Sequence, residues 1–143
     1  MYVRWKHRRS TAVDLVTRLR QGRHGRGGNP GNVSHSAYLV ESVRVDGKPR
    51  QRTVAYLGFI AEQRGPGIGQ PQNLQNPAAR YWFWRDACAI LDGVTMDDAT
   101  RARCETVLAS VVPPLVGDDL ADFQARLAAF RMQHDAWATP QSR

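Results

Sequence analysis

A group of basic side chains near the middle of the chain could recognise a polyanion. Arg44 and Lys48 flank an Asp-Gly pair, and Arg50 and Arg52 follow at a spacing of two residues. An arginine guanidinium is a planar fork that pairs with two phosphate oxygens, or with two acceptors on a guanine edge. We expect Arg44 and Lys48 to contact the phosphates of a nucleic acid. Arg50 and Arg52 are predicted to contact phosphates or the groove.

The positive charge is concentrated in the first sixty residues. The net charge of the whole chain is +7; up to Ile60, twelve Lys and Arg against three acids give +9, and the remaining eight Arg against ten acids give −2. This asymmetry is typical of a polyanion-binding end, although a solubilising basic tail would also produce it. Eight more residues of this region are predicted to contact nucleic acid. Two of them are Arg4 and Lys6, and the other six are expected to form an arm that orders on binding: Arg8, Arg9, Arg18, Arg20, Arg23 and Arg26.

Residue types that catalyse reactions or bind metals occur without a functional arrangement. The acids of the second half cluster at expected helix starts, where a carboxylate favours the helix dipole. His7, His24 and His35 are irregularly spaced, which disfavours a zinc site. The glycines between residues 65 and 69 lack the Lys-Ser/Thr of a phosphate-binding loop. We therefore expect no enzyme, no metal and no cofactor.

The same sequence favours a cytoplasmic protein. No segment approaches the roughly 18 to 20 apolar residues of a membrane span. Residues 1–9 are charged and precede no apolar run, so we expect no secretory signal. Cys88 and Cys104 have no partner at ligand spacing, and we expect two reduced thiols rather than a disulfide.

Alternation and turn residues predict a small antiparallel sheet in residues 1–61. A short strand is expected over 2–6, an amphipathic helix over 12–20 and a mobile Gly/Arg loop over 21–35. Residues 36–45 and 50–57 are rich in β formers and predict a β-hairpin. Pro49 cannot donate to a ladder, which favours a turn from Asp46 to Pro49 over a two-residue turn. Period-2 geometry predicts that Arg50, Arg52, Val54 and Tyr56 share one face.

The remainder of the chain predicts a linker over 62–76, a helical module over 77–137 and a tail over 138–143. Three amphipathic helices are expected: from Pro77 to about Asp92, from about Asp98 to the Pro113-Pro114 pair, and from about Asp118 to Ala136. They should form a small bundle, or a helical hairpin with an arm. Their apolar stripes are expected to contain Tyr81, Trp84, Cys88 and Leu91; Cys104, Val107, Leu108 and Val111; and Leu120, Phe123, Leu127 and Phe130.

Four consecutive aromatic residues on the first of these helices point all round it. Tyr81 and Trp84 fit the core stripe, so Trp82 and Phe83 are expected to be exposed and to anchor a protein interface, with stacking on bases as the other role open to them. The alternative is a core that covers the helix on both sides.

The hairpin also resembles a known segment. Tyr38–Gly58, with its Glu-Ser pair, Asp-Gly-Lys turn, Arg-Gln-Arg-Thr strand and final Tyr-Leu-Gly, resembles a region near the N-terminus of certain bacterial insertion-sequence transposases. The opening Met1–Arg4 is similar as well, and the whole chain resembles small bacterial and mobile-element proteins that carry this module. The resemblance implies DNA engagement ahead of a catalytic domain. We expect no transposition by this chain, because an RNase H-like fold would not fit in its length and residues 10–34 are inserted.

Together these patterns predict an α+β fold and a nucleic-acid-binding protein. The expected partner is duplex DNA, with RNA as the alternative polyanion. A second hypothesis is a protein-binding adaptor or inhibitor that docks on a nucleoprotein enzyme through its aromatic helix. The patterns do not predict an oligomeric state.

Overall fold

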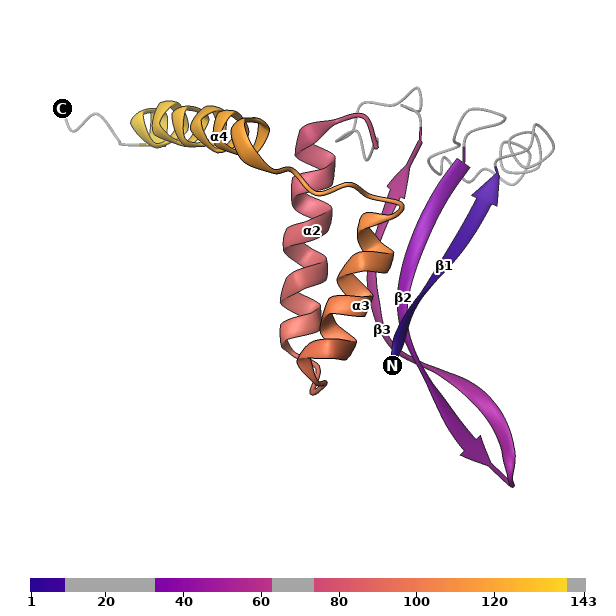
Figure 1. Cartoon of the computed structure of the whole chain (residues 1–143). Helices are drawn as coiled ribbons and strands as arrows, with labels where there is room; N and C mark the ends of the chain where they lie inside the picture. The colour runs from indigo at the N-terminus through magenta and orange to yellow at the C-terminus, as the bar shows by residue number, and fades with distance from the viewer. Residues whose placement is uncertain (10–32, 63–73, 139–143) are drawn as a thin grey trace.

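The computed structural model describes residues 1–9, 33–62 and 74–138. Within them the chain forms a three-stranded antiparallel sheet followed by three helices, which confirms the predicted α+β class. Figure 1 shows helices α2 (Pro77–Asp92) and α3 (Asp98–Ala109) side by side over one face of the sheet, while α4 (Gly117–Ala138) extends away from them. The predicted helix over 12–20 lies outside the described residues, as does most of the predicted loop over 21–35.

The sheet has the order β1-β2-β3, so the central strand is β2. Strand β1 (Tyr2–Arg9) pairs with β2 (Val33–Val45), which in turn pairs with β3 (Lys48–Ala61). The first strand was predicted and runs three residues further, to Arg9. Its ladder reaches Val33, so residues 33–35 belong to β2 and not to the loop predicted there.

A two-residue turn joins β2 to β3, so the predicted turn from Asp46 to Pro49 is wrong. Asp46 and Gly47 both have a positive φ, 51° and 74°, as in the type I′ turns of two-residue hairpins. Val45 and Lys48 form the cross-strand pair next to the turn, and Arg44 and Pro49 form the following pair. In such a hairpin this second pair is not hydrogen-bonded, and its N–H groups point away from the partner strand. Because β3 is an edge strand, Pro49 removes no hydrogen bond from the ladder.

Two register shifts in the hairpin change which side chains share a face. They lie along Ala37–Val40, and at each of them β3 carries one extra residue. Such β-bulges interrupt the period-2 alternation. Tyr56 therefore pairs with Tyr38 on the face away from the helices, whereas Arg50 and Arg52 have the opposite orientation. The prediction that these arginines share a face with Tyr56 is wrong.

The starts of the first two helices and the end of the first agree with the capping signals in the sequence, whereas the second ends at Ala109, before the Pro113-Pro114 pair at which its end was predicted. Helix α2 (Pro77–Asp92) begins after Asn76, whose side chain accepts from the Ala78 amide, and ends at Gly93. Helix α3 (Asp98–Ala109) begins after Asp97, whose carboxylate accepts from the Thr100 amide at 2.6 Å. Helix α4 spans Gly117–Ala138. None of these helices, in the part of the chain that is described, is both long and apolar enough to cross a bilayer.

One hydrophobic core joins the sheet to α2 and α3. Its buried side chains come from all three strands, from both helices and from one residue that follows α3: Val3, Ala37, Leu39, Leu57, Ile60, Phe83, Ala87, Leu91, Cys104, Leu108 and Val112. The helices of the predicted module 77–137 therefore share a core with the sheet of residues 1–61. Burial raises the pKa of the Cys104 thiol. Both Cys88 and Cys104 are free thiols.

The buried stripe of α2 differs from the prediction. Phe83, Ala87 and Leu91 are buried at the spacing i, i+4, i+8, while Tyr81 is half-buried. The ring of Phe83 stacks on Trp5 of β1 at a centroid distance of 5.9 Å. The prediction that Phe83 is exposed is wrong, because the sheet covers the helix on the side that carries Phe83.

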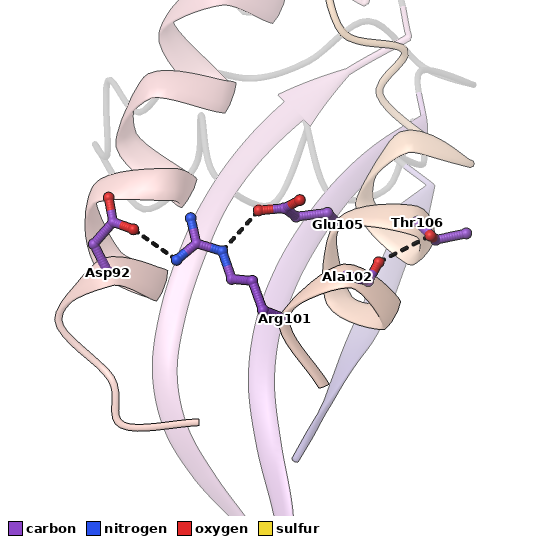
Figure 2. A network of polar contacts seen from close by, with 5 residues as sticks. All are labelled: Asp92, Arg101, Ala102, Glu105 and Thr106. Atoms are coloured by element: carbon purple, nitrogen blue, oxygen red, sulfur yellow. Dashed lines mark hydrogen bonds and ion pairs between the residues drawn. The ribbon is translucent and has the colours of Figure 1, made fainter. Parts of the chain in front are cut away.

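An arginine holds α3 against the end of α2. Arg101 of α3 donates to Asp92 at 2.6 Å and to Glu105 at 2.7 Å, as Figure 2 shows. These hydrogen bonds raise the pKa of Arg101. Because its guanidinium pairs with these two carboxylates, we assign Arg101 a structural role in holding α3 against α2.

Helix α4 contacts the rest of the structure near its beginning. Phe123 lies against Tyr81 of α2 with a centroid distance of 4.9 Å. Further along, Phe130 is 57% exposed and Met132 is 74% exposed. Figure 1 shows the helix directed away from the sheet, so the three helices form a helical hairpin with an arm.

Candidate nucleic-acid interface

The turn end of the hairpin projects beyond the helices, as Figure 1 shows. Every residue from Arg44 to Val54 is exposed. The type I′ turn and the pairing of Val45 with Lys48 keep this end a regular two-stranded ribbon. We call the part from Glu41 to Arg52 the hairpin tip.

The hairpin tip carries cations on both faces of its ribbon. Arg44 lies on the face away from the helices. Lys48, Arg50 and Arg52 pair with Val45, Val43 and Glu41 of β2, and lie on the other face. The structure thus brings the four predicted contacts of the hairpin to one projecting ribbon but divides them between its faces.

The cations of the hairpin tip are not equally available. Arg52 forms a hydrogen bond and an ion pair with Glu41, its cross-strand neighbour. Arg44, Lys48 and Arg50 form no ion pair with another described residue. Because a guanidinium has five donors and the Arg52 side chain is 69% exposed, Arg52 keeps outward donors as well.

A second group of cations lies on the face of the sheet that the helices leave uncovered. We call this the open face. Cross-strand pairing places Arg4, Lys6 and Arg8 of β1 on it. It also contains the rings of Tyr38 and Tyr56, whose centroids are 5.2 Å apart.

The side chains of the open face contact one another across strands. Arg4 donates to the Gln51 side chain at 2.7 Å, which connects β1 to β3 over the central strand. The Lys6 ammonium lies 4.6 Å from the centroid of Tyr38, a cation–π geometry. The pKa of Tyr56 is raised, because the effect of desolvation exceeds that of a hydrogen bond with Ser36, which lowers it.

Sequence reasoning missed Tyr38 and Tyr56 as candidate site residues. The available signal was an aromatic residue in each strand of a basic hairpin. Strict alternation, however, assigned Tyr56 to the face of Arg50, and a bulge in β3 moves it to the face of Tyr38.

Two of the histidines meet at the other end of the sheet. The Nδ1 atoms of His7 and His35 are 2.6 Å apart, and Nε2 of His35 lies 3.0 Å from a carboxylate oxygen of Glu62. His35 is buried, and its ring is nearly perpendicular to that of Trp5, with the centroids 6.3 Å apart. The cluster ties together the ends of all three strands. Across the described ranges, no group of three His, Cys, Asp or Glu side chains could hold a metal ion.

The remaining predicted site residues have different positions. Arg9 ends β1 and is exposed. Arg18, Arg20, Arg23 and Arg26 lie outside the described residues. Trp82 was predicted to be exposed but is half-buried, with the Arg85 guanidinium 4.3 Å from the centroid of its ring and the Tyr81 ring at 5.0 Å. Phe83 belongs to the core, so the predicted protein interface loses one of its two anchors.

Comparison with known proteins identifies the segment that contains the hairpin. Residues 27–76 match the model of the IS1634 family transposase N-terminal domain. The match covers β2, β3 and the connection up to the N-cap of α2, which is 50 of the 143 residues. No curated protein and no solved structure matches the chain. The segment is thus similar to a domain of mobile-element proteins, which confirms the resemblance to the N-terminal region of insertion-sequence transposases.

Proposed function

We propose that this chain is a non-catalytic DNA-binding protein whose hairpin tip contacts duplex DNA. The observation that carries the proposal is a projecting two-stranded ribbon with cations on both of its faces. The major groove of B-DNA is about 12 Å wide and admits a two-stranded β-ribbon. The match to a transposase N-terminal domain supports DNA as the polyanion.

The two faces of the hairpin tip suit different contacts. On a ribbon inserted into a groove, cations near the turn can reach the phosphates of both strands. We assign phosphate contacts to Arg44 and Lys48 because they flank the turn on opposite faces. Arg50 follows on the face of Lys48 and suits a bidentate contact with a guanine edge. Arg52, held by Glu41, is assigned a phosphate contact through its outward donors.

The assignment is tested by measuring DNA affinity as a function of salt. If about six of the basic residues up to Ile60, those of the hairpin tip among them, contact phosphates, the log–log slope for duplex DNA should be about −5, from about −0.9 per contact. Replacing Lys48 and Arg50 by alanine should reduce the magnitude of this slope by about two if both contact phosphates. If Arg50 reads a base edge, binding should weaken by about 1 to 3 kcal/mol and sequence preference should fall.

A matched control removes the same charge elsewhere. Arg126 and Arg131 are exposed on α4, so Arg126→Ala with Arg131→Ala also subtracts two charges. This control should leave the salt slope close to that of the parent protein. Salt-independent binding, or equal losses in the two double variants, would reject the hairpin tip as the DNA contact.

A further inference from the structure

The open face combines exposed aromatic rings with cations. Tyr56 is 49% exposed, although it stands in the middle of a strand and beside the ring of Tyr38. Arg4 and Lys6 lie on the same face, on β1 at the other edge of the sheet. An exposed tyrosine ring on a sheet is a large flat apolar surface that needs little ordering to receive a second ring.

The charge of the open face has one sign. The strand residues that the register assigns to it include Arg4, Lys6, Arg8 and Arg44, and no Asp or Glu. The nearest carboxylate on β2, Glu41, lies on the opposite face and pairs with Arg52. Arg4 and Arg8 are four residues apart, which is about 13 Å along a strand. The face is therefore complementary to an extended chain of negative charges.

We propose that the open face binds unpaired DNA, with a base stacked on Tyr56 and phosphates along Arg4, Lys6 and Arg8. The proposal rests on the proposed function in taking DNA as the polyanion, but it concerns another surface and another form of DNA. A sequence-tolerant single-strand site combines a basic track with aromatic rings on which bases stack.

The open face fits a single strand better than a duplex. In a duplex the flat faces of the bases are stacked on one another, so a ring on a sheet surface can contact only backbone and base edges. An unpaired base exposes its face to Tyr56. A cation–π contact already holds the Lys6 ammonium over the ring of Tyr38. The ammonium is thus beside the two tyrosine rings, where the phosphates of a bound strand would run.

The first test compares two substitutions of Tyr56 in the full chain. The probe is a fluorescein-labelled oligothymidine of about 15 nucleotides, within the usual site size of such surfaces. Tyr56→Phe keeps the aromatic face and should bind like the parent protein. Tyr56→Leu keeps an apolar side chain and removes that face, and should weaken binding roughly 5- to 150-fold, the factor for stacking one base. Equal binding by the leucine and phenylalanine variants would overturn the proposal.

The second test locates the strand on the protein. A bromodeoxyuridine strand cross-linked by light should modify the tryptic peptide Thr53–Arg64, in which Tyr56 is the one tyrosine. Modification confined to other peptides would overturn the proposal and would indicate that another part of the chain covers this face. An RNA strand of the same sequence that binds more tightly, with the same dependence on Tyr56, would overturn the assignment to DNA.

The cations are tested separately from the ring. Lys6→Ala with Arg8→Ala should reduce the magnitude of the single-strand salt slope by about 1.4, from about −0.7 per contact. An unchanged slope would contradict the phosphate track.

The two proposals fail in different ways. If Lys48→Ala with Arg50→Ala lowers duplex affinity while Tyr56→Leu leaves single-strand affinity unchanged, the hairpin tip stands and the open-face site is rejected. If Tyr56→Leu lowers single-strand affinity while the hairpin variant binds duplex DNA like the parent, the open-face site stands without the hairpin function.

Discussion

Gly58 of β3 lies directly beneath the ring of Phe83 of α2. A Cβ atom at Gly58 would lie 3.0 Å from two carbons of that ring. Gly58 also has a φ of 148°, a backbone conformation that side chains disfavour. The glycine thus allows the helix to approach the sheet, and Phe83 fills the space that the missing side chain leaves.

Replacing Gly58 by alanine should therefore destabilise the protein by at least about 1 to 3 kcal/mol, because strain and overpacking act together. Urea denaturation measures the effect. The control is Gly93→Ala at the end of α2, where φ is −78° and an added Cβ meets its nearest atom at 3.5 Å. A Gly58 variant as stable as the Gly93 variant would contradict this account.

The aromatic residues of α2 should contribute unequally to stability. Phe83 is 5% exposed and stacks on Trp5, so Phe83→Ala should cost about 3 to 5 kcal/mol of unfolding free energy. Its half-buried neighbour Trp82 is covered by Arg85, and Trp82→Ala should cost much less. Thermal unfolding of both variants checks the order. The reverse order would mean that Trp82 is the core residue.

The shared core predicts that neither half of the chain folds alone. A fragment that ends at Glu62 lacks Phe83, Leu91 and Leu108, and leaves Leu39 and Ile60 exposed on the sheet. Small sheets without a packed face are marginal. We expect no cooperative unfolding transition for this fragment or for one from Leu74 onward, and a restored transition when the two are mixed. A cooperative transition in either separate fragment would show independent modules.

Acid should weaken the start of α3 through Asp97. Hydrogen bonds from the Thr100 amide and the Thr100 side chain lower the pKa of the Asp97 carboxyl. A pKa that is lower in the folded state contributes stability above the unfolded value, and this contribution is lost as pH falls through the folded pKa.

Stability measured from about pH 5 to about pH 2 should therefore fall more steeply in the parent than in Asp97→Asn. Asparagine still caps the helix but does not titrate in this range. Parallel pH profiles for the two proteins would exclude Asp97 as a source of the acid sensitivity.

Local chemistry determined much of the secondary structure. The limits of α2 follow from residues at its two ends. Asn76 caps the start with its side chain, Pro77 lacks an N–H that would be unpaired there, and Gly93 ends the helix, each acting within one turn of chain. The hairpin was predictable from β formers around Asp46-Gly47. The transposase resemblance of Tyr38–Gly58 was likewise present in the residues themselves.

The tertiary structure decided which faces these elements present. Nothing local distinguishes Phe83 from Trp82, since the choice depends on a sheet that brings Gly58 and Trp5 to one side of the helix. The bulges of β3 depend on its pairing with β2. Because side chains in a strand alternate between two faces, one extra residue moves every side chain beyond it to the opposite face. For this reason the sequence predicted the basic residues of the proposed nucleic-acid surface, while the contact between Tyr56 and Tyr38 follows only from the folded sheet.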